Sequence, residues 1–85
     1  MSPEAGIELY KLISDWNPLQ LEAGFDYDPE IYDTISAIYE SDDAHVVGRA
    51  IQEIFNQSFE TVIPLAEIHP ITERALVLKR LYNDV

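Results

Sequence analysis

The chain has 85 residues, no cysteine, and sixteen acidic against five basic residues, which give a formal net charge of −11. A chain of this length predicts a single domain over residues 1–85 with a thin core, because small domains bury only about 60% of the surface of their unfolded chains. The absence of cysteine excludes disulfides, thiolate nucleophiles and thiolate metal sites. The negative charge disfavours direct binding to nucleic acid and to anionic membranes, since both require basic surface.

The charge is unevenly distributed along the chain. Residues 1–43 contain eleven acids and a single base, Lys11, whereas residues 44–85 contain five acids and four bases. Such a field speeds association with a basic protein partner. The first residues lack the basic start and apolar run of a signal peptide, and no stretch reaches the roughly 20 apolar residues of a membrane span. We therefore expect a soluble, cytoplasmic protein.

The first predicted helix covers residues 3–15. Ser2, Pro3 and Glu4 are typical of a helix start, because serine caps free amides, proline suits the first helical position and glutamate complements the positive helix end. The apolar residues that follow share one helical face, and they are Leu9, Leu12, Ile13 and Trp16. Pro18 ends this helix, since the residue before a proline is disfavoured in helical geometry.

A loop and two helices are predicted next. Residues 17–27 have no sustained period and are predicted to form a loop, with Leu19, Leu21 and Phe25 on the core. The second helix runs from Asp28 to Tyr39 or Glu40, with a stripe of Ile31, Ile35, Ile38 and Tyr39. The third follows Ser41-Asp42-Asp43 and extends to Asn56 or Phe59, with a stripe of Val47, Ala50, Ile51, Ile54 and Phe55. The β-branched cluster in residues 59–63 would suit a short strand, but no second strand exists to pair with it, so we expect an extension of this helix or coil, with helix, strand and coil all left open.

The fourth helix is predicted to open at Pro70, after a connector over residues 65–69. Ile63 and His69 each precede a proline, and residues in that position favour extended geometry. The predicted buried stripe consists of Ile71, Ala75, Leu78 and Tyr82, and it is widened by Leu76, Val77 and Leu81. This helix is therefore either buried on two sides or offers a surface for homodimer formation. The fold class is predicted as all-α, with about four short helices in an orthogonal array or irregular bundle.

No motif of the chain points to catalysis or to a cofactor. Asp26-Tyr27-Asp28 resembles the start of a calcium loop, but the required glycine and glutamate positions hold Ile31 and Ala37. His45 and His69 lie 24 positions apart without metalloprotease spacing, so backbone or capping roles are expected for both. There is no GxSxG motif and no glycine-rich phosphate loop. We therefore expect no enzyme, no metal and no cofactor.

Tyrosine and acidic residues together suggest a contact surface for a basic protein. Tyr10, Tyr27 and Tyr32 fall beside the apolar stripes, whereas Trp16 is expected in the core. The candidate partner-binding residues are Asp26, Tyr27, Asp28, Glu30, Asp33, Glu40, Asp42 and Asp43. The only clustered bases are Arg74, Lys79 and Arg80, which are expected to complement a helix end or to pair with acids.

Several short motifs in this order resemble the YugE-like family of small bacterial proteins of unknown function. The motifs are Trp16-Asn17-Pro18, Ile31-Tyr32-Asp33, Ser41-Asp42-Asp43, Ile51-Gln52-Glu53-Ile54-Phe55 and Ser58-Phe59-Glu60. The resemblance covers roughly residues 9–80, and the first eight residues depart from it. It implies an orthogonal array of four helices and a bacterial cytosolic setting, and it carries no catalytic residues.

Three functional hypotheses follow. The first is a non-enzymatic protein-interaction module that binds a basic partner, with an immunity-type inhibitor of a nuclease as its sharper version, because carboxylates would stand where phosphates bind. The second is a small hydrolase or metal-binding protein that uses the acidic loop from Asp26 to Glu30. The third is a structural homodimer through the fourth helix, which enlarges a thin core.

Overall fold

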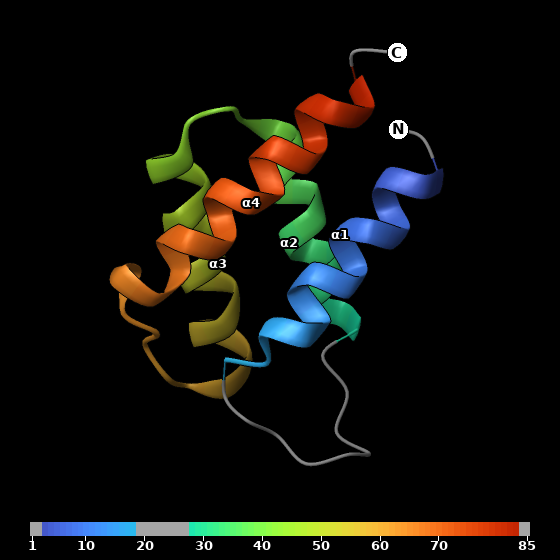
Figure 1. The fold of residues 1–85 in the computed structure, drawn as a ribbon. Coiled ribbons are helices and arrows are strands. Elements are labelled where there is room, and N and C mark those ends of the chain that lie inside the picture. Colours follow the sequence, from blue (N-terminus) through green and yellow to red (C-terminus); the bar gives the residue numbers. More distant parts are fainter. Residues whose placement is uncertain (1–2, 19–27, 84–85) are drawn as a thin grey trace.

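The computed structural model describes residues 3–18 and 28–83, and within these residues the chain is helical with no β-strand. Four helices follow one another: α1 (Pro3–Trp16), α2 (Asp28–Glu40), α3 (Ala44–Phe59) and α4 (Leu65–Asn83) (Figure 1). The predicted all-α class with four helices is confirmed. None of the described helices has the length and apolarity that crossing a membrane requires.

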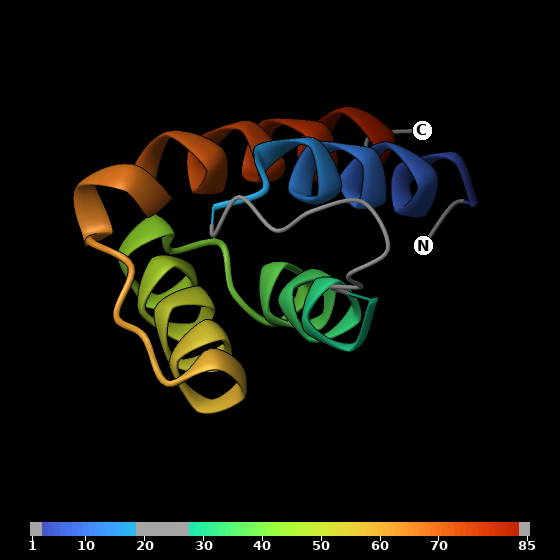
Figure 2. The same ribbon diagram turned by 90° about the horizontal axis from the view of Figure 1, so that it is seen from below.

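The helices form two layers. α1 and α4 lie side by side and run in opposite directions, while α2 and α3 cross beneath them at different angles (Figure 2). α4 packs against each of the other three helices. The centre of α4 is therefore buried on its inner side, and its outer side remains open.

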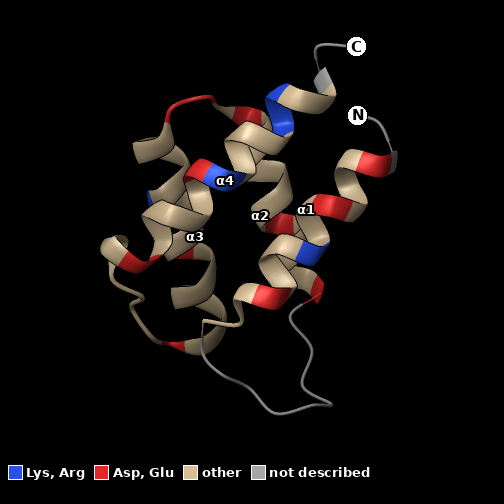
Figure 3. Cartoon of the chain, viewed as in Figure 1, with Lys and Arg blue, Asp and Glu red and all other residues tan. Residues whose placement is uncertain are grey.

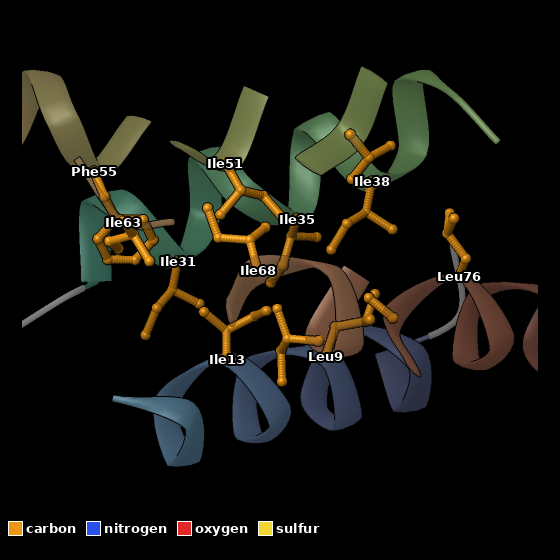
Figure 4. Close-up of a cluster of buried hydrophobic side chains, with 13 residues drawn as sticks. Leu9, Ile13, Ile31, Ile35, Ile38, Ile51, Phe55, Ile63, Ile68 and Leu76 are labelled. Carbon is orange, nitrogen blue, oxygen red and sulfur yellow. The ribbon is translucent and has the colours of Figure 1, made fainter. Parts of the chain in front are cut away.

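The core fills the space between the layers and consists of aliphatic side chains with the aromatic ring of Phe55 at one end (Figure 4). Its buried members are Leu9, Ile13, Ile31, Ile35, Ile38, Val47, Ile51, Phe55, Ile63, Ile68, Ile71, Ala75 and Leu76. Phe55 is fully buried, and the ring of Trp16 meets it edge-on with 5.8 Å between ring centroids. The predicted packing of Trp16 against the core is confirmed, although this side chain is only partly buried.

The boundaries of the first three helices agree with the prediction within a residue or two. α1 ends at Trp16, one residue later than predicted, and Asn17 adopts a positive φ of 38°. α3 reaches Phe59, where Glu60 takes a left-handed conformation and its amide donates to the Asn56 carbonyl at 2.8 Å. Residues 61–64 are coil, so the ambiguous segment is not a strand. The predicted loop residues Leu19, Leu21 and Phe25 lie outside the described residues.

The predicted start of the fourth helix is wrong. α4 begins at Leu65, so the connector predicted over residues 65–69 is helical and Pro70 lies inside the helix. Proline lacks an amide proton, so the Ala66 carbonyl loses its helical partner, but Ala66 is exposed and water can satisfy it. Ile68 is fully buried, and its carbonyl accepts a hydrogen bond from the Thr72 hydroxyl at 3.0 Å. Burial of Ile68 holds the added turn against the core.

Candidate functional site

The predicted acidic contact residues fall into groups with different environments. Asp26 and Tyr27 lie outside the described residues. Asp28, at the start of α2, accepts a hydrogen bond from the Tyr10 hydroxyl and so ties α2 to α1. Glu30 is only 8% exposed. The structure therefore engages Asp28 and Glu30 in the packing of α2, where they add little to the exposed acidic surface.

Two more of these residues organise the turn between α2 and α3. Asp43 caps α3, because its Oδ1 accepts hydrogen bonds from the amides of His45 at 2.9 Å and Val46 at 3.3 Å. Asp42 forms an ion pair with Lys79, with 2.8 Å between Oδ1 and Nζ. The hydrogen bond and the charge of Lys79 lower the pKa of the Asp42 carboxyl below its ordinary value. Both carboxylates remain at the surface, and the turn is red in Figure 3.

The outer side of α2 carries the remaining candidates. Asp33 and Glu40 are exposed and lie seven residues, or about two helical turns, apart, so they share one side of the helix. Tyr32, which precedes Asp33 in the chain, is 60% exposed, and its ring centroid lies 6.0 Å from that of Tyr10 on α1. We call the exposed set Tyr32, Asp33, Glu40, Asp42 and Asp43 the acidic face of α2. It contains an accessible aromatic ring and four exposed carboxylates, of which Asp42 pairs with Lys79 and Asp43 caps α3.

Lys79 has a larger role than the sequence indicated. Its predicted pairing with an acid is confirmed, but the side chain is also buried, and Nζ donates to the carbonyls of Ile38 at 2.8 Å and Ser41 at 3.2 Å. The ring of Tyr39 lies beneath it, with 5.7 Å from Nζ to the ring centroid. Lys79 therefore satisfies carbonyls at the end of α2 from α4. The sequence predicted that Lys79 complements a helix end or pairs with an acid, but no local pattern indicates that the helix end is that of α2.

The two histidines, 24 positions apart in sequence, meet at one pocket. A cavity of about 480 Å³ lies between the first turns of α3 and α4, and it is lined by Ala44, His45, Gly48, Leu65, Ala66, His69 and Pro70. Nε2 of His69 lies 3.1 Å from Oε1 of Glu73, one turn further along α4. Within residues 3–18 and 28–83, no three His, Asp or Glu side chains are grouped so that they could hold a metal ion.

A second hollow lies between α1 and α4. This groove has a volume of about 630 Å³, and its lining is Leu12 from α1 and Pro70, Glu73, Arg74, Val77 and Leu78 from α4. Val77 is 50% exposed and Leu81, one turn further along, is 64% exposed. The three residues predicted to widen the buried stripe of the fourth helix therefore differ in burial. Leu76 is buried, whereas Val77 and Leu81 face outward.

Comparison with known proteins places this architecture in a family. The model of a domain of unknown function, DUF1871, matches residues 8–82. The chain belongs to the DUF1871 family. It is 32% identical over 72 residues to the uncharacterized protein YugE of Bacillus subtilis (strain 168), across 85% of this chain and 83% of that protein. The resemblance to YugE-like proteins is thereby confirmed.

A solved structure of the same fold comes from Bacillus stearothermophilus. That crystal structure matches with a TM-score of 0.88 and 28% identity, and the alignment covers 95% of this chain and 99% of the other. The four-helix arrangement is thus shared by this DUF1871 chain and an experimentally determined protein. The family is one of unknown function, and a fold by itself does not determine an activity.

Proposed function

We propose that this DUF1871 protein is a non-enzymatic protein-interaction module that binds a basic partner through the acidic face of α2. The observation that carries the proposal is Tyr32, an aromatic side chain that is 60% exposed and directly precedes the exposed Asp33 in the chain. Exposed tyrosines are frequent anchors at protein interfaces, because the ring offers apolar area and the hydroxyl a hydrogen bond. Acids around such an anchor favour arginine and lysine on the partner.

The net charge of the chain adds a kinetic advantage for the same partner. At −11 the field of the protein attracts a basic surface from solution and repels acidic proteins. The advantage decreases as salt rises, because the Debye length falls to about 8 Å at physiological ionic strength. A nuclease is one class of basic partner, and an immunity-type inhibitor would cover its phosphate-binding cleft with these carboxylates.

The test compares a face variant with a charge-matched control. The face variant combines Tyr32→Ala, Asp33→Asn and Glu40→Gln, and the control combines Glu4→Gln and Asp15→Asn at exposed positions of α1. Both variants lose two negative charges. Immobilised wild type and both variants are incubated with a lysate of the native host, and the retained proteins are identified by mass spectrometry.

We expect wild type and the control to retain a basic protein that the face variant loses. Its purified form should associate with wild type at least about tenfold more slowly when salt is raised from low to high ionic strength. Equal retention by the face variant, or an association rate indifferent to salt, would contradict the proposal. If the retained protein is a nuclease, added wild type should suppress its cleavage of DNA or RNA.

A further inference from the structure

The outer side of α4 is an apolar ridge beside a groove. Pro70, Val77 and Leu81 are exposed along this side, and the groove between α4 and α1 opens next to them. Leu12 of α1 and Leu78 of α4 are apolar residues that line this groove. Apolar side chains gathered in this way gain free energy when a partner covers them.

The charged residues on this ridge could pair with opposite charges on a second copy of the same ridge. Glu73 lies four residues before Val77 and Arg80 lies three residues after it, so both occupy the same side of the helix, away from Leu81. A twofold axis beside Val77 that pairs two copies of α4 in antiparallel fashion brings Glu73 of each copy toward Arg80 of the other. Figure 3 shows an acidic and a basic segment next to each other in the middle of α4, further basic segments toward its end and an acidic segment at its start.

The same antiparallel pairing of two α4 helices also places a side chain in the groove. Leu81 lies on the side of the ridge that faces α1, and antiparallel pairing about Val77 carries Leu81 of one copy to the level of Glu73 and Arg74 of the other. That level is where the groove lies. An apolar side chain thus meets an apolar hollow at the same register in which the opposite charges meet.

We propose that the outer side of α4 binds a second copy of this chain, with the two α4 helices antiparallel and Val77 beside the twofold axis. The partner is a copy because a single register satisfies both the charges and the groove. Nε2 of His69 lies 3.1 Å from Oε1 of Glu73, so Oε2 of the same carboxylate can accept from the copy's arginine. The exposed charges next to Val77 include both signs, which limits local repulsion despite the net charge of −11, and the remaining repulsion is screened beyond about 8 Å at physiological ionic strength.

The first test is charge reversal, measured as the dimer dissociation constant by sedimentation equilibrium at protein concentrations up to about 1 mM. Glu73→Arg alone and Arg80→Glu alone each create two like-charge contacts, so each should raise the dissociation constant at least about tenfold. The double variant restores opposite charges and should return to within about threefold of wild type. A wild type that stays monomeric, or a double variant no tighter than the singles, would overturn the proposal.

The second test fixes the register and uses the absence of cysteine in the chain. Val77→Cys places one thiol beside the proposed twofold axis, so the proposed register brings it close to the same thiol of the other copy. Val46→Cys is the matched control, because Val46 is 53% exposed on α3 and Val77 is 50% exposed. Under mild oxidation the Val77 variant should form a covalent dimer much faster than the control. Equal rates for both variants would rule out this register.

Discussion

Nζ of Lys79 on α4 lies 2.8 Å from Oδ1 of Asp42, in the turn that links α2 to α3. The same ammonium group donates to the Ile38 and Ser41 carbonyls, which stand at the end of α2. The last carbonyls of a helix have no partner within it and carry partial negative charge. Lys79 therefore links α4 to the end of α2 and to the turn that precedes α3.

Replacement of Lys79 by methionine should destabilise the protein by about 1–3 kcal/mol, because the Ile38 and Ser41 carbonyls lose a charged donor that water replaces only in part. Urea unfolding at neutral pH measures the loss. Lys11→Met is the control, since Lys11 is exposed on α1 and its replacement should change the free energy of unfolding by no more than about 0.5 kcal/mol. Equal effects of the two substitutions would show that the contacts of Lys79 contribute nothing.

The Asp42 carboxylate makes stability depend on pH at the acidic end. Its pKa in the folded protein is lowered by the hydrogen bond and charge of Lys79, whereas in the unfolded chain it has the ordinary value of about 4. The stabilisation is therefore complete above about pH 4 and is lost as pH falls through the lower, folded pKa. Urea unfolding of wild type and Asp42→Asn from pH 7 downward should show a difference that shrinks only below about pH 4. A difference that stays constant over this range would contradict the assignment.

Asp43→Ala should cost about 1 kcal/mol, because Oδ1 of Asp43 accepts from the amides of His45 and Val46 at the start of α3. The melting temperature and urea midpoint should both fall. Asp33→Ala removes the same charge from an exposed position within α2 and should leave stability within about 0.5 kcal/mol of wild type. If both variants lose the same free energy of unfolding, the cap is not the cause.

Gly48→Ala should stabilise α3 by about 0.5–1 kcal/mol, because glycine inside a helix loses more conformational entropy on folding than alanine does. Space for the methyl group exists, since a Cβ there would lie 3.7 Å from Cγ2 of Ile68 and 3.8 Å from Oγ1 of Thr72. The reciprocal change on the same helix, Ala50→Gly, should lower stability by a similar amount. A lower melting temperature for Gly48→Ala would mean that α3 and α4 cannot accept the added methyl group.

The amino-acid sequence predicted the first three helices because their signals are local. Asp28 and Asp43 stand at helix starts, and the apolar residues recur at helical spacing over short windows. The same pattern predicted the all-α class and most of the core, including Phe55 and the packing of Trp16. For the candidate site, the sequence predicted Asp33, Glu40 and Tyr32 as contact residues at the surface, and all three are exposed.

Other features depend on contacts between residues far apart in the chain, and only the tertiary structure decided them. α4 begins at Leu65, before Pro70, because Ile68 is buried in the core. This burial outweighs the preference of His69, which precedes a proline, for extended geometry. The position of Lys79 under the end of α2, 41 residues from Ile38, follows from the way α4 crosses that helix. The sequence determined where most helices form, because that choice depends on neighbours within a few residues. Which polar side chains are buried, paired or left exposed was decided by the packing of the helices, because it brings together groups that no local pattern connects.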